Sequence, residues 1–240
     1  MRYGNTTNSK SKPKSTYRKR NYGKKVYKKR TLRPMYQSVN YPLATSVTKR
    51  LKYVERIQLN PALTGAIASY TFCANDLYDP NRSGTGHQPY GFDQLMSLYN
   101  HYQVIGSKLR FTVTGALNES FVYGVQLNDS LTMSSSNVEA ICEQPYAKRK
   151  IVAPGSTTQK DLSMSSSFSL KKYFGPRSNV NTLIGNRSFM GQETTSPAEA
   201  AFYVIWCASN GPTVDPSTIT FHVEIEYLAI FSEPKDLQQS

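Results

Sequence analysis

The stretch Ile219-Thr220-Phe221-His222-Val223-Glu224-Ile225-Glu226-Tyr227 alternates apolar and polar side chains without a break. Successive side chains of a β-strand point to opposite faces of the sheet. Strict alternation over this length therefore predicts a strand with one face on a hydrophobic core and the other in water. His222, Glu224 and Glu226 are expected on the wet face.

Similar patterns recur upstream. Leu109, Phe111 and Val113 alternate with polar residues over 108–114. Val54, Ile57 (imperfectly) and Leu59 alternate with Arg56, Gln58 and Asn60, which predicts a weaker strand near 50–60. Further candidate strands are Ala66–Ala74, Phe121–Asn128, Tyr146–Ala153, Lys160–Leu170 and Ala201–Ala208. The last is apolar on both faces, which is typical of a central strand covered on each side. About eight strands with Pro- and Gly-rich connections predict an all-β fold, a single eight-stranded jelly-roll sandwich with short helices in its connections.

Two short helices are expected in the connections. Phe92, Leu95, Met96 and Tyr99 follow the i, i+3, i+4, i+7 spacing of a helix, which leads directly into a strand over 102–114. The segment 136–139 has the spacing of a capping box, from Ser136 to Glu139, and predicts the start of a second helix.

The charge of the chain is divided sharply along its length. Residues 1–54 contain sixteen Lys and Arg and no acid; the remaining thirteen Lys and Arg of the total 29 face all 16 acids, a net charge of −3 over 55–240. Between residues 1 and 34 only Val26 and Leu32 are aliphatic, so this segment cannot bury enough apolar surface to offset its ordering entropy. We therefore expect a disordered basic arm over residues 1–48 and a jelly-roll domain over residues 49–240.

The arm has the composition of a nucleic-acid-binding segment. Tyrosine rings among the cations can stack on unpaired bases while the cations contact phosphates, which favours single strands over duplexes. If all sixteen cations contacted phosphates, the log–log salt slope of binding would approach about −11. The predicted nucleic-acid-binding residues are Arg2, Lys10, Lys12, Lys14, Tyr17, Arg18, Lys19, Arg20, Tyr22, Lys24, Lys25, Tyr27, Lys28, Lys29, Arg30 and Arg33.

Runs of exposed lysine and arginine also serve as nuclear-import signals. Both uses require the same accessible cations, so they do not compete as interpretations. The residues predicted to contact a host nuclear import receptor are Arg18, Lys19, Arg20, Lys24, Lys25, Lys28, Lys29 and Arg30.

No catalytic chemistry is indicated. The chain has three histidines, His87, His101 and His222, and contains no HExxH, P-loop or GxSxG motif. Asp76 and Asp79 lie in a Pro- and Asn-rich loop, where turn formation explains them more simply than cation binding. We expect no enzyme activity, no catalytic residue, no cofactor and no metal site.

The cysteines predict free thiols, and the apolar segments are too short for a membrane span. Cys73, Cys142 and Cys207 are odd in number and lack zinc-site spacing, so free buried thiols are expected. The longest apolar run, residues 200–208, is far shorter than the ~20 residues of a membrane-spanning helix. No membrane insertion is expected.

The body carries two clusters of basic residues, Lys148-Arg149-Lys150 and Lys171-Lys172. They are either solvent-facing strand ends or a second contact, with nucleic acid or with an acidic cell-surface glycan. Glu224 and Glu226 are expected to pair with basic neighbours across strands.

The segment Gly86-His87-Gln88-Pro89-Tyr90-Gly91-Phe92-Asp93-Gln94-Leu95, continued through residues 99–102 and 107–111, resembles a signature of capsid proteins from circovirus-like viruses with circular single-stranded DNA. The resemblance implies a jelly-roll subunit, a small icosahedral shell of about 60 copies, and an arm that faces the genome and directs nuclear import. It places the protein in the virion and, during assembly, in the host nucleus. It also implies that the helix near Phe92 lies between the third and fourth strands. No role of the Gly86–Gly91 loop follows from the sequence, and a subunit contact is one option for it.

The function expected from these observations is that of a viral capsid protein that self-assembles and packages single-stranded DNA without sequence specificity. A coat protein of a small RNA virus and a cellular basic nucleic-acid-binding protein are the alternatives.

Overall fold

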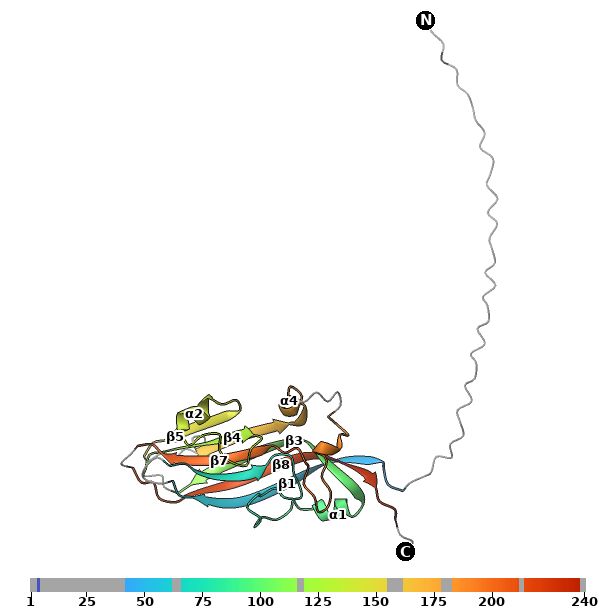
Figure 1. Ribbon diagram of the computed structural model, residues 1–240, viewed down its shortest axis with the longest axis horizontal. Coiled ribbons are helices and arrows are strands. Elements are labelled where there is room, and N and C mark those ends of the chain that lie inside the picture. Colours follow the sequence, from blue (N-terminus) through green and yellow to red (C-terminus); the bar gives the residue numbers. More distant parts are fainter. Residues whose placement is uncertain are drawn as a thin grey trace, which may run out of the picture. The chain divides into compact units, whose positions relative to one another are not determined.

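The computed structural model describes Gly4 and residues 42–61, 66–115, 119–154, 162–177, 183–211 and 214–237. Within these ranges the chain forms two four-stranded sheets, with every neighbouring pair of strands antiparallel (Figure 1). The strands are β1 (Ser46–Leu59), β2 (Ala68–Cys73), β3 (Tyr99–Thr114), β4 (Phe121–Asn128), β5 (Ala147–Val152), β6 (Ser163–Ser169), β7 (Phe202–Ser209) and β8 (Ile219–Pro234).

The order of the strands confirms the predicted jelly roll. One sheet runs β1-β8-β3-β6 and the other β2-β7-β4-β5, so the first strand lies beside the last and the chain passes repeatedly from sheet to sheet. This connectivity is that of the eight-stranded, double-sheet jelly roll. The short helices α1 (Phe92–Met96), α2 (Val138–Glu143) and α4 (Leu170–Phe174), and the 3₁₀ turn η1 (Arg187–Phe189), all lie in connections between strands.

Strand β8 occupies an interior position and shows the alternation expected of it. Its odd-numbered residues from Ile219 to Phe231 are buried, whereas His222 is exposed and Glu224 and Glu226 are half-buried. The strand continues seven residues beyond Tyr227. It pairs with β1 on one side and with β3 on the other, which gives the first sheet its longest ladders.

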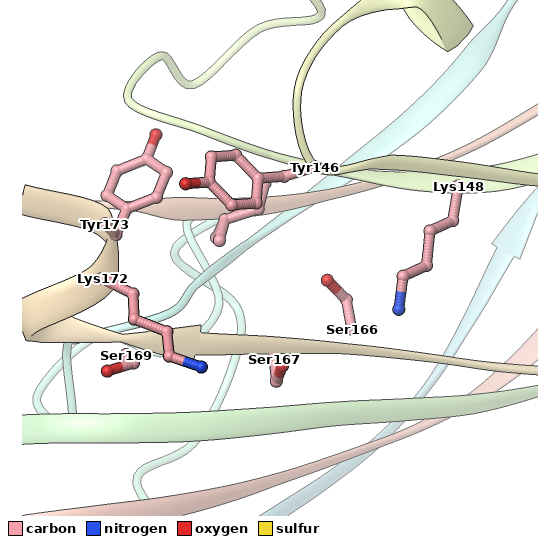
Figure 2. Close-up of a pocket in the computed structure, with 8 residues that line it drawn as sticks. Tyr146, Lys148, Ser166, Ser167, Ser169, Lys172 and Tyr173 are labelled. Atoms are coloured by element: carbon pink, nitrogen blue, oxygen red, sulfur yellow. The ribbon is translucent and has the colours of Figure 1, made fainter.

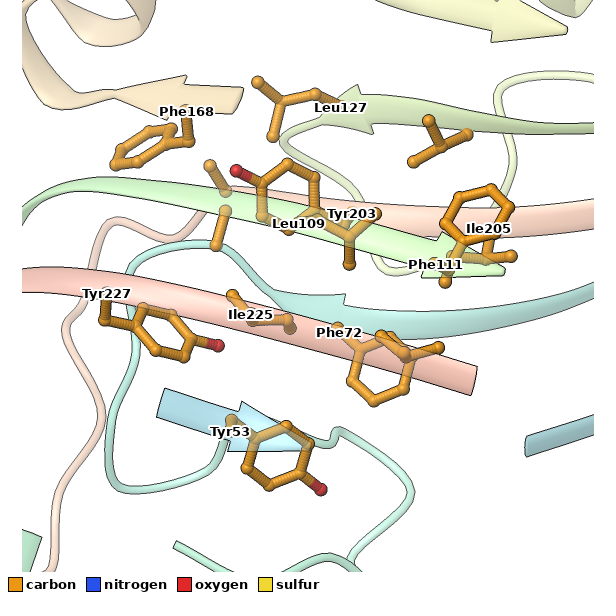
Figure 3. Packing of buried hydrophobic residues seen from close by; sticks show 14 of the residues in the cluster. Tyr53, Phe72, Leu109, Phe111, Leu127, Phe168, Tyr203, Ile205, Ile225 and Tyr227 are labelled. Atoms are coloured by element: carbon orange, nitrogen blue, oxygen red, sulfur yellow. The ribbon is translucent and has the colours of Figure 1, made fainter. Parts of the chain in front are cut away.

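The two sheets are held face to face by large aromatic side chains. Phe111 of β3, Tyr123 of β4 and Phe221 of β8 form mutual ring contacts with centroids 5.6–6.4 Å apart. Figure 3 shows this packing from close by, with Tyr203 and Tyr227 among the buried rings. Full burial of one such side chain contributes about 1.5–3 kcal/mol, so the inter-sheet core is the main source of stability.

Tyrosine hydroxyls link the sheets through polar contacts inside this core. Tyr227 of β8 donates to the carbonyl of Cys73 at 2.7 Å, and Tyr203 of β7 donates to the carbonyl of Ser107 at 3.1 Å. Burial raises the pKa of both tyrosines above the usual range. Because each hydroxyl is paired across the sandwich, the core accommodates these polar atoms without leaving them unsatisfied.

Strand β7 is covered on both faces, as its composition predicted. Every residue from Phe202 to Ser209 is buried. One face, with Tyr203, packs into the inter-sheet core, and the other carries Trp206 against Ile141 of α2. The helix predicted near residue 136 is present, but the predicted capping box from Ser136 to Glu139 is wrong. Asn137 is the N-cap of α2 and accepts hydrogen bonds from the backbone N–H groups of residues 139 and 140.

Two predictions about α1 are wrong. The helix ends at Met96 instead of reaching Tyr99, because Tyr99 begins β3 and pairs with Pro234 of β8. The burial of the Tyr99 ring, which suggested a helical face, is achieved from a strand. The helix also lies between β2 and β3, the second and third strands, because only two strands precede it among the described residues.

The inward face of β1 also differs from expectation. Leu51, Tyr53, Ile57 and Leu59 point into the core, whereas Val54 is 54% exposed on the outer face. Glu55 occupies the inward position between Tyr53 and Ile57. Because a charged residue stands where the pattern requires an apolar one, the alternation of apolar and polar residues in β1 is hard to recognise in the sequence.

Gly124 in β4 lies where no side chain fits. An added Cβ would lie 2.5 Å from Cζ2 of Trp206 and closer still to the carbonyl oxygen of Lys148. We expect Gly124→Ala to lower the free energy of unfolding by about 1–3 kcal/mol, because it overpacks the site. Urea unfolding monitored by Trp206 fluorescence measures this. Gly211→Ala is the control, since its Cβ would meet Val214 at an ordinary 3.6 Å; equal effects of the two substitutions would contradict the prediction.

The three cysteines are free thiols in different environments. Cys73 and Cys207 are buried, and burial raises the pKa of the Cys207 thiol to about 12 and that of Cys73 well above its usual value. Cys142 is only half-buried. Because thiolates are the reactive form, we expect one thiol per native chain to react quickly with a small thiol reagent near neutral pH, and all three after unfolding. Cys142→Ser should remove the fast phase; a second fast thiol in the native protein would show that the core opens.

Candidate nucleic-acid interface

The predicted nucleic-acid-binding and import residues, from Arg2 to Arg33, all lie outside the described residues. Three further cations of the basic N-terminal region are described. Lys49, Arg50 and Lys52 belong to β1, which begins at Ser46, and are exposed on the sandwich. Thirteen of the sixteen cations therefore precede the first strand. The division at residue 48 stays a prediction.

The outer face of the β1-β8-β3-β6 sheet has a central acidic strand flanked by basic ones. Lys52 of β1 and Lys108 of β3 stand opposite Glu226, and Arg110 of β3 stands opposite Glu224. The Nζ of Lys52 lies 3.0 Å from a carboxylate oxygen of Glu224. The predicted cross-strand pairing of the glutamates is therefore confirmed for Glu224.

A second group of cations surrounds a hollow of about 290 Å³ where the outermost strands of the two sheets, β5 and β6, come together. The lining residues are Leu127, Tyr146, Lys148, Ser166, Ser167, Ser169, Lys172 and Tyr173, and none of them is acidic. Figure 2 shows Lys148 and Lys172 approaching the space over Ser166 and Ser167 from opposite sides. The structure thus brings one residue from each predicted basic cluster into a single site.

Lysines of β5 also fasten the two sheets together at this edge. The Nζ of Lys148 donates to the carbonyl of Ser165 at 2.7 Å, and that of Lys150 donates to the carbonyl of Ser163 at 2.8 Å. Edge strands present unpaired backbone groups that can recruit other chains. These lysines provide hydrogen bonds to two backbone carbonyls of the edge strand β6. The bond to Ser165 also keeps the ammonium group of Lys148 near the hollow.

The aromatic wall of the hollow consists of Tyr146 and Tyr173, whose ring centroids are 5.6 Å apart. Tyr146 precedes β5 and has φ 63°, a left-handed conformation that is uncommon outside glycine. Its ring is about half exposed. Tyr173 is buried in α4, with the guanidinium of Arg177 stacked 4.0 Å from its ring centre, and burial raises its pKa. Its hydroxyl has no hydrogen-bond partner among the described residues.

Helix α4 is the element of this site that the sequence analysis missed. Leu170, Tyr173 and Phe174 are its buried residues and follow the i, i+3, i+4 spacing of a helix. That spacing was available in the sequence, but the preceding alternation through 163–169 favoured a continuing strand.

The Gly86–Gly91 loop has a structural role that the sequence did not disclose. The His87 ring stacks on Tyr53 at 4.6 Å, and a Cβ on Gly86 would lie 2.5 Å from that of Asn81. Asn81 in turn donates to both carboxylate oxygens of Glu55 at 2.8 and 2.9 Å. The loop therefore closes over a buried polar network. Its predicted subunit contact stays a prediction.

Asp76 is a buried acceptor of hydrogen bonds that hold the surrounding loop and β3 together. It is fully buried and accepts hydrogen bonds from the hydroxyl of Tyr102 at 2.5 Å and from the backbone N–H of Tyr78 at 2.9 Å. Its other oxygen lies 3.9 Å from the guanidinium of Arg82. Arg82 also pairs with Asp79 at 3.0 Å. Arg82 therefore lies within ion-pair distance of both aspartates.

The histidines lie on separate elements. His87 is in the loop described above, His222 is on the outer face of β8, and His101 of β3 lies 3.0 Å from a carboxylate oxygen of Glu233. Over the ranges that the structure describes, no three His, Cys, Asp or Glu side chains are grouped as metal ligands. No helix in those ranges has the length and apolarity to cross a membrane.

No protein-family model matches the chain, and no curated protein matches it. Solved structures with similarity include one of Cocksfoot mottle virus, with 11% identity over 98% of this chain and 97% of that chain and a TM-score of 0.45. Another is the decameric BFDV capsid protein, with 14% identity over 78% and 99% and a TM-score of 0.41. A third is of Turnip yellow mosaic virus, with 11% identity over 83% and 87% and a TM-score of 0.43. The jelly-roll assignment rests on the strand order given above.

Replacing Asp76 tests its role as a buried acceptor. We expect Asp76→Ala to lower the free energy of unfolding by about 1–3 kcal/mol, because the buried hydroxyl proton of Tyr102 loses its partner. Asp76→Asn keeps an acceptor oxygen and should cost clearly less. Thermal or urea unfolding of both variants measures the difference, and equal losses would show that the charge of Asp76, rather than its acceptor, is what matters.

Proposed function

We propose that this chain is a viral capsid protein whose jelly-roll domain assembles with further copies into a closed shell, and whose basic N-terminal segment packages single-stranded DNA. The observation that carries the proposal is the separation of charge: a run of cations without a single acid is joined to a near-neutral jelly roll. A fold alone does not define a function. The combination supports the proposal, since a rigid building block and a phosphate-binding segment are the two components that a packaging shell requires.

The cations that precede β1 set the strength of the phosphate contact. Thirteen Lys and Arg lie between residues 1 and 45, and the three on β1 are fixed to the sandwich. If those thirteen contact phosphates, the log–log salt slope is about −9, lower than the −11 of all sixteen. Such binding is strong, sensitive to salt and independent of sequence.

The type of nucleic acid follows from the tyrosines and from the sequence resemblance. Tyr17, Tyr22 and Tyr27 are interspersed with the cations, and their rings can stack only on bases that are not hidden in a duplex. The signature at 86–111 resembles that of circovirus-like capsid proteins, which favours DNA as cargo. The same cations would be read by a host nuclear import receptor, which places assembly in the nucleus.

The decisive experiment is electron microscopy of the purified full chain, followed by sequencing of its nuclease-protected nucleic acid. We expect closed particles that contain single-stranded DNA of mixed sequence. Protected RNA would refute the DNA assignment. A chain that stays monomeric at every salt concentration, with or without nucleic acid, would refute the shell.

Deletion of residues 1–34 removes all thirteen cations that precede β1. We expect this variant to keep the unfolding midpoint of the full chain, because all described core residues lie beyond the deletion, but to protect no nucleic acid and to stay out of the nucleus. A Lys→Arg variant of the segment conserves the charge and should still package. Loss of folding in the deletion variant would place the domain boundary elsewhere.

A further inference from the structure

We propose that the hollow between β5 and β6 binds one nucleotide of a single-stranded nucleic acid, with the phosphate held by Lys148 and Lys172 and the base stacked on Tyr146. This is a second contact, separate from the N-terminal segment. It rests on the proposed function for the identity of its ligand.

The positive charge of the lysines around the hollow favours an anionic ligand. The ammonium groups of Lys148 and Lys172 converge on it from different elements, and the lining contains no carboxylate. Two like charges directed into one space repel each other unless an anion lies between them. Lysine is a common ligand of phosphate, which it binds as a point charge.

Hydrogen-bond donors complete the phosphate site. Ser166, Ser167 and Ser169 are among the lining residues, and the side chain of Ser166 lies on the buried face of β6, whereas those of Ser167 and Ser169 lie on its other face. Serine hydroxyls and lysines are among the groups that contact phosphate oxygens in nucleic-acid complexes.

Tyr146 provides the aromatic surface. A left-handed backbone conformation is unfavourable for a non-glycine residue, and such conformations are concentrated at functional sites. Here it holds a half-exposed ring beside the two lysines. A stacking ring next to backbone-binding cations is how proteins bind single strands. The Tyr173 ring is too close, at 5.6 Å, for a base to enter between the two, so the site stacks one base on the exposed ring.

The size of the site fits a single nucleotide. A hollow of about 290 Å³ is slightly smaller than the smallest typical small-ligand pockets, whose range is about 300–1,000 Å³. In a double helix the bases are paired and stacked on one another, so their faces are not accessible. Only a single strand can therefore place a base in this hollow.

The test is lysine acetylation of the full chain, followed by mass spectrometry, with and without a short single-stranded oligodeoxynucleotide. We expect severalfold slower acetylation of Lys148 and Lys172 when the oligonucleotide is present, with little change at Lys108 on the sheet face. Protection of Lys108 to the same extent would overturn the proposal in favour of general electrostatic coating.

The acetylation rates of the N-terminal lysines distinguish a failure of this proposal from a failure of the proposed function. Protection of Lys24, Lys25, Lys28 and Lys29 without protection of Lys148 and Lys172 would overturn the nucleotide site and leave packaging intact. Absence of protection at both sets would refute both. Protection of Lys148 and Lys172 by a heparin fragment but not by the oligonucleotide would overturn the proposal and assign the hollow to an acidic glycan.

Photochemical cross-linking identifies the stacked residue. An oligonucleotide that carries 5-iodouracil should cross-link to Tyr146, and the yield should fall severalfold in Lys172→Gln, whereas Lys108→Gln leaves it unchanged. Lys172 has no described hydrogen bond within the fold, so its substitution avoids the inter-sheet bond of Lys148.

Variants of Tyr146 test the stacking by the acetylation measurement. The protection of Lys148 from acetylation should survive in Tyr146→Phe and weaken in Tyr146→Ala. Equal protection in both variants would overturn base stacking.

Discussion

The pairing of β8 with both β1 and β3 is the constraint on which the rest of the molecule depends. The ladder with β1 runs from Ser46 opposite Ser232 to Leu59 opposite Ile219, and the ladder with β3 covers almost the same length of β8. A shift by one residue would exchange the buried and wet faces of the strand, so the register is fixed by burial. The single irregularity, between Val104 and Gly106 of β3, is absorbed without changing the inward face of β8.

The hydroxyls of Tyr203 and Tyr227 are compatible with this core because each is hydrogen-bonded to a partner across it. The hydroxyls of Tyr203 and Tyr227 bond to backbone carbonyls of the opposite sheet, and Asp76 accepts from Tyr102 at one end of the sandwich. Such bonds have direction, whereas apolar packing has little. They therefore fix how the two sheets are aligned, while the aromatic contacts supply most of the stability.

The charges of the sandwich are arranged so that they do not interfere with this core. On the outer sheet face, Glu224 and Glu226 of β8 lie between cations of β1 and β3, and Glu224 forms an ion pair with Lys52. At the edge formed by β5 and β6, lysines are gathered around a hollow whose lining has no acid. We propose nucleic-acid contacts in the segment before β1, which has no acid, and at this edge, where the lining of the hollow has none.

The sequence by itself determined the strands, most of their limits and the division of charge, because alternation and charge are properties of neighbouring residues. It failed where local pattern and tertiary environment disagree: Tyr99 is buried from a strand instead of a helix, and Glu55 occupies an inward position because Asn81 binds it. Only the tertiary structure decided which strands pair and which loops close on one another. It alone brought Lys148 and Lys172 around one hollow and set the backbone of Tyr146, since contacts between residues distant in the chain depend on how the two sheets stack.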